Sequence, residues 1–288
     1  MNSTETASNT AAPTQSITAG DNSYAYRRLG PSAGTPLLFL QHFTGTLDNW
    51  DPAVTDPLAL GRPVILFESP GIGRSSGKVP ETVAGMADHA MTFLDALGLT
   101  EVDVLGFSLG GMVAQVIALK RPALLRRIIL TGTGPAGGIG VAMDRPELLK
   151  IFVDQKMPAS DKLLRLFFET TETSQSAGRN FVQRLARRTE DKDTPTSAES
   201  AAAQLRAMAA WAKSGGEPHA ELKRITQPVL VTNGNNDIMI PTVNSFTLSA
   251  HLPNAQLIIY PDSGHGSLFQ HAGAFVSHVT EFLDRRDG

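Results

Sequence analysis

The sequence predicts an α/β protein with a mostly parallel, doubly wound sheet that carries an inserted helical cap. Two observations lead to this prediction. Short apolar runs bounded by turn residues alternate with stretches of helical periodicity, and this alternation breaks once, after Thr131. Alternating strands and helices are typical of parallel sheets. A length of 288 residues fits one such domain with an insertion.

The first half of the chain contains four apolar runs with the composition of strands buried on both faces. They cover residues 36–41, 63–68, 101–107 and 126–131. Ahead of them, residues 23–29 alternate in polarity, which predicts a more exposed leading strand. Helices are expected at residues 81–98, where apolar side chains form one stripe, and at residues 110–120, where Pro122 stops the helix.

The break after Thr131 begins with a Gly-rich segment and continues without strand character. Within it we expect helices at residues 146–154, 161–169, 177–188 and 198–213, with Gly215, Gly216 and Pro218 closing the excursion. A strand at 227–233, a helix at 241–251, a strand at 255–260 and a helix at 273–285 follow. The predicted organisation is a disordered polar tail (residues 1–22), an α/β core (residues 23–131 and 222–288) and a helical cap (residues 132–221).

Composition excludes several classes of protein. With 25 Lys and Arg against 28 Asp and Glu, the chain offers no excess of positive charge for nucleic acid or an anionic membrane. The absence of cysteine removes thiol catalysis and Cys-based metal sites. The first 22 residues lack the features of a secretory signal, and no apolar run reaches the ~18 residues of a membrane span. We therefore expect a cytoplasmic protein without cofactor, metal, nucleic-acid or membrane partner, and homo-oligomer formation stays open.

Residues 106–110 read Gly-Phe-Ser-Leu-Gly, a G-x-S-x-G motif between an expected strand and an expected helix. The flanking glycines let a tight turn approach its neighbours where a Cβ would clash, which exposes the hydroxyl of Ser108 above the sheet. The start of the next helix adds positive potential for an oxyanion. A match to the G-x-S-x-G pattern is by itself only moderately specific for a nucleophilic serine. Their position favours Ser108 as a nucleophile over a turn serine that caps the helix.

A nucleophilic serine needs a histidine base, which a carboxylate holds in one tautomer. Catalytic groups collect at the carboxyl ends of parallel strands, so we searched the segments after the last two expected strands. These segments contain Asp237 and His265. The chain order Ser, Asp, His is that of α/β-hydrolases. Asp262 competes for the role of the acid, but it lies only three residues from His265 and is better explained as a turn residue.

Several segments then carry a family resemblance. Residues 41–45 (Gln-His-Phe-Thr-Gly), residues 68–75 (Glu-Ser-Pro-Gly-Ile-Gly-Arg-Ser), the serine turn and residues 263–265 (Ser-Gly-His) occur in family order. The chain resembles bacterial α/β-hydrolases of the capped esterase, lactonase and cofactor-free haloperoxidase type. This resemblance spans nearly all of residues 23–285, and the cap matches only in length and helical character. It implies an oxyanion hole formed by the backbone amides of Phe43 and Leu109.

The oxyanion loop departs from the family pattern. Gln41 stands where the family commonly has His, and His42 stands where it commonly has Gly. If that second position requires a positive φ, His42 is strained by about 1–3 kcal/mol. Such strain would not prevent the backbone N–H of Phe43 from donating a hydrogen bond to an oxyanion. A satisfied loop histidine is favoured over a catalytic role for His42.

The predicted function is hydrolysis of a carboxylic ester or lactone through an acyl-enzyme. Similar epoxide hydrolases and haloalkane dehalogenases carry aspartate where this chain has Ser108, so serine directs the chemistry to acyl transfer. The sequence does not choose among ester, lactone, C–C and amide bonds. Two alternatives remain, namely perhydrolase or cofactor-free haloperoxidase activity on the same triad, and a non-catalytic receptor for a small ligand.

The cap is rich in apolar side chains, so we expect an apolar small-molecule substrate. These side chains are Leu163, Leu164, Leu166, Phe167, Phe168, Phe181, Leu205, Met208 and Trp211. Each of them could line the pocket or only dock the cap on the core, and for any single residue docking is favoured.

Overall fold

The computed structural model describes residues 8–154, 156–213, 217 and 219–285, which fold around an eight-stranded sheet. The strands are β1 (Gln15–Ala19), β2 (Asn22–Leu29), β3 (Leu37–Leu40), β4 (Val64–Phe67), β5 (Val102–Phe107), β6 (Leu125–Thr131), β7 (Val229–Gly234) and β8 (Ala255–Tyr260). Their order across the sheet is β1-β2-β4-β3-β5-β6-β7-β8. The pairs β1–β2 and β2–β4 are antiparallel, and the other pairs are parallel. The sheet is mostly parallel, as the sequence predicts.

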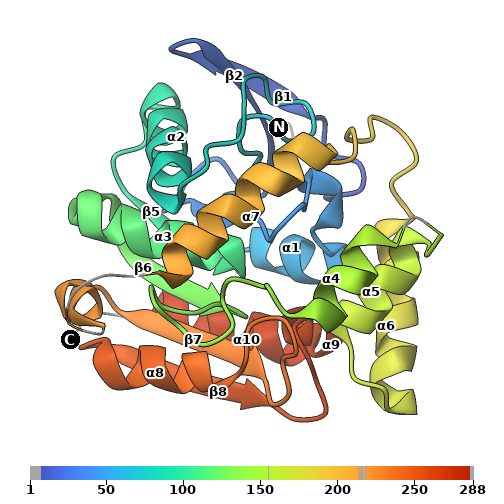
Figure 1. Ribbon diagram of the computed structural model, residues 1–288. Helices are drawn as coiled ribbons and strands as arrows, with labels where there is room; N and C mark the ends of the chain where they lie inside the picture. Colours follow the sequence, from blue (N-terminus) through green and yellow to red (C-terminus); the bar gives the residue numbers. More distant parts are fainter. Residues whose placement is uncertain (1–7, 155, 214–216, 218, 286–288) are drawn as a thin grey trace.

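Helices cover the sheet and form an insertion between β6 and β7. They are α1 (Pro52–Ala59), α2 (Val83–Ala96), α3 (Leu109–Lys120), α4 (Pro146–Val153), α5 (Ala159–Phe167), α6 (Glu172–Leu185), α7 (Ala198–Ala212), α8 (Val243–His251), α9 (Ser267–Gln270) and α10 (Ala272–Asp284), with 3-10 turns η1 (Leu47–Asn49), η2 (Pro122–Leu124) and η3 (Ala220–Arg224). Helix α2 packs on α3, and α1 packs on α10. Figure 1 shows α4, α5 and α6 grouped together while α7 crosses in front of the sheet.

The apolar runs of the sequence become the centre of the sheet. Every residue of β3, β4 and β5 is buried, because neighbouring strands cover both edges and helices cover the faces. Asp103 is buried within β5, where the guanidinium of Arg126 binds it at 2.5 Å. Helix α3 is buried from Leu109 to Ala118, so it lies inside the domain rather than on its surface. This central position fixes the turn that joins β5 to α3.

The prediction of a disordered tail over residues 1–22 is wrong for residues 15–19, which form β1. The strand pairs antiparallel with β2 across a turn in which Gly20 has φ 59°. Upstream, Asn9 is buried, and its side-chain amide donates to the carbonyl of Trp50 at 2.8 Å. Polar composition concealed these long-range contacts. Residues 1–7 lie outside the described part of the chain.

Strand β2 is not the exposed leading strand that its alternating polarity suggested. β1 and β4 flank it on both edges, and residues 24–27 are buried. The ring of Tyr26 lies 5.4 Å from that of Phe93 in α2, so a helix covers this face. Arg27 on the strand is fully buried because Asp48 binds it at 2.6 Å and Asp193 binds it at 3.2 Å.

The four helices of the insertion fall within the predicted cap, with shifted boundaries. Helix α6 begins at Glu172, five residues earlier than expected, because the Thr171 side chain accepts a hydrogen bond from the backbone of Ser174 and caps the helix. Helix α1 was not predicted, although Asp51 followed by Pro52 is a helix-start signal. We call residues 132–221 the cap below. Gly215, Gly216 and Pro218, expected to end it, lie outside the described residues.

Candidate active site

Ser108 occupies the sharp turn between β5 and α3. Its backbone has φ 56° and ψ −117°, a conformation that costs a non-glycine residue about 1–3 kcal/mol and persists only where the surroundings impose it. A Cβ at Gly106 would lie 2.5 Å from the carbonyl oxygen of Gly110, and a Cβ at Gly110 would collide with the carbonyl of Leu40. The two glycines of the motif therefore allow the turn to pack against β3.

The Ser108 hydroxyl and one ring nitrogen of His265 are both left unpaired. Ser108 Oγ and His265 Nε2 are buried and have no hydrogen-bond partner among the residues that the structure describes. The ring of Phe107, the residue before Ser108, lies 4.8 Å from the ring of His265. Gly132 passes beside both rings, since a Cβ there would lie 3.0 Å from Phe107 and 3.2 Å from His265. This end of the sheet thus holds an unpaired hydroxyl and an unpaired imidazole nitrogen.

Asp237 and His265 form a buried pair. His265 Nδ1 lies 2.7 Å from Asp237 Oδ2, and both side chains are 0% exposed. The other carboxylate oxygen accepts the backbone N–H groups of Met239 at 2.7 Å and Ile240 at 2.9 Å. With both oxygens occupied, the carboxylate is fixed in orientation and holds the proton of the neutral ring on Nδ1. Nε2 is then left as a proton acceptor.

Asp262, the competing acid, lies elsewhere. It has φ 48°, and its carboxylate accepts a hydrogen bond of 2.7 Å from the hydroxyl of Thr171 at the start of α6. The residue sits in a turn that contacts the cap. This position supports the expected turn role.

The loop after β3 carries Phe43 and is held by side chains. Gln41 Oε1 accepts the backbone N–H of His42 at 2.9 Å, and Gln41 Nε2 donates to the carbonyl of Thr46 at 2.9 Å. The positive φ of this loop lies at Thr44, at 61°, and not at His42, so the condition for strain at His42 is not met. Leu109 is the first residue of α3, and the N–H of such a residue has no partner within its helix.

A cap residue fixes the strained position of this loop. The backbone N–H of Thr44 donates to Gln204 Oε1 on α7 at 2.8 Å, and the Thr44 carbonyl accepts from the hydroxyl of Thr196 at 2.8 Å. Sequence reasoning missed Gln204, because a polar residue on a cap helix gives no sign of what it contacts 160 positions away.

His42 is an uncharged, buried loop residue. Its Nδ1–H donates to the carbonyl of Phe43 at 2.8 Å. Burial lowers the pKa of His42 to about 3, with a further lowering by the nearby His265, so the ring is neutral at ordinary pH. It lies 5.3 Å from the rings of Phe107 and Phe167 and, with Leu109, borders a cavity of about 20 Å³.

Phe167, at the end of α5, lies over the His265 loop. Its carbonyl accepts the N–H of Gly266 at 2.8 Å, and its ring lies 5.4 Å from that of His265. Among the apolar cap residues expected to line the pocket or dock the cap, Phe167 therefore does touch the candidate site. The sequence offered no way to select it from its neighbours Leu166 and Phe168.

Beneath the loops lies a buried carboxyl group, Glu68. Burial raises its pKa to about 8, with a further increase from Asp193 of the cap. The backbone N–H groups of Arg74, at 2.7 Å, and Leu47, at 3.3 Å, oppose the shift only in part. Glu68 thus stays protonated at neutral pH while it holds two loops together.

This shift predicts that stability falls as pH rises. Between the ordinary carboxyl pKa of 4.5 and the folded value of about 8, the folded protein keeps a proton on Glu68 that the unfolded chain has released. The contribution is fully present below pH 4.5 and is lost as pH rises through 8. Glu68→Gln should remove most of this decline, measured by chemical denaturation from pH 5 to 8.5. The exposed control Glu101→Gln should keep the wild-type slope, and an unchanged slope in Glu68→Gln would refute the shift.

Two properties of the described residues bear on cofactors and membranes. No group of three or more His, Cys, Asp or Glu side chains is placed there to hold a metal ion. In the same part of the chain, no helix is both long and apolar enough to cross a membrane.

Comparisons with known proteins agree on the fold. A family model described as "alpha/beta hydrolase fold" matches residues 35–272. An α/β hydrolase fold protein from Chitinophaga pinensis is 41% identical with a TM-score of 0.92, covering 97% of this chain and all of that one. A 2-hydroxymuconate semialdehyde hydrolase from Pseudomonas sp. (strain CF600) is 30% identical over 88% of this chain and 89% of the relative. Est816, described as an N-acyl homoserine lactone degrading enzyme, has a TM-score of 0.71 at 22% identity, covering 93% of this chain and all of that one.

Proposed function

The chain belongs to the α/β hydrolase family, and from this membership we propose that it is a serine hydrolase acting on a carboxylic ester or lactone of a small apolar molecule. The family match and the Chitinophaga structure confirm the predicted fold class. The observation that carries the finer proposal is the buried His265–Asp237 pair, together with His265 Nε2 and Ser108 Oγ, which are both buried and have no hydrogen-bond partner among the described residues.

In the proposed mechanism Ser108 Oγ attacks the substrate carbonyl while His265 Nε2 takes its proton. Asp237 stabilises the imidazolium that forms. The oxyanion of the tetrahedral intermediate accepts the N–H groups of Phe43 and Leu109, and its collapse expels the alcohol, which takes the proton from His265. A water that His265 deprotonates then attacks the acyl-enzyme, and the acid is released as Ser108 Oγ takes the proton back from His265.

A second candidate is hydrolysis of a C–C bond. It is favoured by the relative named for 2-hydroxymuconate semialdehyde, a compound whose name contains no ester, lactone or amide. The lactone reading has its own support in the fold likeness to Est816. Both reactions would use the same serine and histidine, so the substrate must be identified by experiment.

The test is a substrate panel with an active-site label. A fluorophosphonate probe should label the wild-type protein, and p-nitrophenyl esters or lactones should turn over faster than 2-hydroxymuconate semialdehyde. Preference for the semialdehyde would select the C–C candidate. Turnover that requires hydrogen peroxide would select the perhydrolase alternative. Ligand binding without labelling or turnover would leave only the receptor and overturn the proposal.

Gln204→Ala should lower kcat by about 10-fold, and because it leaves the N–H of Thr44 without its acceptor it should also cost about 1–3 kcal/mol of stability. The change removes the acceptor that fixes Thr44, so the neighbouring N–H of Phe43 would no longer be held toward the oxyanion. Because an oxyanion contact acts in the transition state, KM should change less than kcat. The matched control Gln175→Ala removes an amide elsewhere in the cap, where its side chain donates to the carbonyl of Glu169. Equal kcat values in both variants would count against the positioning role of Gln204.

A further inference from the structure

Strand β8 forms one end of the described sheet, and its outer edge is open. The carbonyls of Asn254 and Tyr260, at the two ends of the strand, both accept hydrogen bonds from β7 and the residue after it, at 2.8 and 2.9 Å. Because the backbone groups of successive residues in a parallel strand point to opposite edges, the even-numbered residues face β7. The N–H and C=O groups of Ala255, Leu257 and Ile259 therefore point outward. Figure 1 shows β8 at the lower rim of the molecule.

The usual protections of an edge strand are missing from β8. Proteins guard such strands with charged side chains, proline, bulges or a covering element, because an open apolar edge otherwise pairs with another chain. Residues 255–260 read Ala-Gln-Leu-Ile-Ile-Tyr, pair with β7 in unbroken register and are mostly only partly buried. From residue 238 to residue 280, Asp262 is the only Asp, Glu, Lys or Arg. The edge therefore suits an uncharged, apolar partner.

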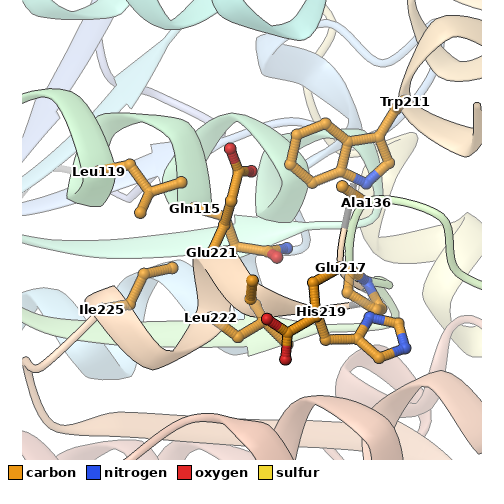
Figure 2. Close-up of a pocket in the computed structure, with 11 residues that line it drawn as sticks. Gln115, Leu119, Ala136, Trp211, Glu217, His219, Glu221, Leu222 and Ile225 are labelled. Carbon is orange, nitrogen blue, oxygen red and sulfur yellow. The ribbon is translucent and has the colours of Figure 1, made fainter. Parts of the chain in front are cut away.

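Helix α8, which covers β7 and β8, has one flank occupied within the chain. The ring of His251, at the end of α8, lies 4.9 Å from the ring of His219, where η3 begins. Because η3 also packs against α3, this flank faces the centre of the sheet. Figure 2 shows His219 at the cap junction, beside a cavity of about 220 Å³ that no residue of β8 borders.

The opposite flank of α8 exposes a large apolar side chain. With 3.6 residues per turn, Phe246 lies ~140° around the helix from His251, which places it toward the open edge of β8. Its side chain is 54% exposed. We call the outward backbone groups of β8, together with Phe246, the β8 edge. An aromatic side chain beside unpaired strand groups is typical of a protein interface.

We propose that the β8 edge binds a second copy of this chain, so that two β8 strands pair antiparallel about a two-fold axis at Leu257. In that register Leu257 exchanges both backbone hydrogen bonds with its own copy, and Ala255 exchanges both with Ile259 of the other copy. All outward groups of the strand then have partners. The pairing joins two eight-stranded sheets into one and removes the open edge.

The position of Phe246 selects a second copy over an unrelated strand. The chain turns between α8 and β8 at residues 252–254. Six helical steps back from residue 252 to Phe246 cover ~9 Å, and three strand steps from residue 254 to Leu257 cover ~10 Å. Phe246 and Leu257 thus lie at the same level, so the axis at Leu257 also brings the two Phe246 side chains toward each other. A strand from another protein would pair with β8 but would bring no counterpart for Phe246.

Sedimentation equilibrium of the full chain at pH 7 tests the proposal. At ~10 µM we expect twice the chain mass of 30.7 kDa, with a dimer fraction that falls on dilution. Phe246→Lys and Phe246→Glu should each raise the dissociation constant of the dimer at least ~10-fold, because two like charges then meet at the axis. An equimolar mixture of the two variants should restore the dimer, since opposite charges then meet. Phe246 is exposed, so neither variant puts folding at risk.

The matched control is Leu60→Lys. Leu60 is 76% exposed at the end of α1, which packs beside β2 and β4 at the other end of the sheet, so this variant should stay dimeric. Ser108→Ala should also stay dimeric, which makes the result independent of the proposed function.

Hydrogen–deuterium exchange locates the contact on the strand. The amides of Leu257 and Ile259 should exchange at least ~10-fold more slowly in the wild-type dimer than in Phe246→Lys, because only the dimer gives them acceptors. The amides of Gln256 and Ile258, which donate to β7 in either state, serve as the internal control. A wild-type chain that is monomeric at ~100 µM, a dimer that persists in both Phe246 variants, a mixture that stays monomeric, or unchanged exchange at Leu257 and Ile259 would each overturn the proposal.

Discussion

Ser108→Ala is expected to lower the kcat for ester hydrolysis by a factor of about 10⁴ or more and to leave the fold intact. The hydroxyl is the only proposed nucleophile, and without it no acyl-enzyme forms. Loss of the side-chain oxygen costs the fold little, because Ser108 Oγ has no hydrogen-bond partner among the described residues. Alanine keeps the Cβ of serine, so the strain of the positive φ at this position and the packing of Gly106 and Gly110 are the same as in the wild type.

The matched control is Ser267→Ala. Ser267 lies two residues after His265 and is also a buried serine with an unpaired hydroxyl, so it is the best rival nucleophile on structural grounds. We expect this variant to keep labelling and near-normal kcat, measured on the best substrate of the panel. Mass spectrometry of the fluorophosphonate adduct should place it on Ser108. An adduct on Ser267, or near wild-type kcat in Ser108→Ala, would mean that the nucleophile is wrongly assigned.

Asp237→Asn should lower kcat by about 10⁴-fold, a loss known for the corresponding change in a serine protease. The geometry gives the reason. Oδ1 accepts the N–H groups of Met239 and Ile240, so the oxygen of the new amide must stay there and its NH₂ group must face His265. The ring nitrogen Nδ1 then becomes an acceptor, and Nε2 carries the hydrogen. A histidine in that tautomer cannot take the proton of Ser108.

Asp262→Asn is the control, and its kcat should change by no more than about 3-fold, because an amide oxygen can still accept from Thr171. Besides kcat, ¹⁵N NMR of the histidine ring should show His265 protonated on Nδ1 in the wild type and on Nε2 in Asp237→Asn. The opposite pattern of activity, severe loss in Asp262→Asn with a nearly normal Asp237→Asn, would transfer the acid role to Asp262.

The central strands, the serine turn and the positions of Asp237 and His265 could be predicted because their signals are local. Strands buried on both faces must be apolar throughout, as in β4, and a turn as tight as that at Ser108 requires glycines at fixed offsets. The ends of β7 and β8 place Asp237 and His265 at one edge of the sheet, since parallel strands share that edge. Their 2.7 Å contact agrees with this argument, while their catalytic roles remain predictions.

Strand β1 and the boundary of the tail could not be predicted. The segment from Gln15 to Ala19 is polar and short, and it becomes a strand only because β2 offers it an edge. The burial of Arg27 on β2 could not be predicted either, since a charged residue is expected at the surface unless its partners are known. Those partners, Asp48 and Asp193, lie 21 and 166 positions away along the chain.

By itself the sequence determined the order of strands β2 to β8 and the tight turn at Ser108, and it singled out His265 and Asp237 as candidates, because these depend on composition and on spacing along the chain. The tertiary structure decided which cap residues touch the site and that Thr44 rather than His42 carries the positive φ. Such features depend on pairs of groups that meet only when distant segments pack, as Gln204 meets Thr44. Sequence periodicity and composition do not show which distant residues form such pairs.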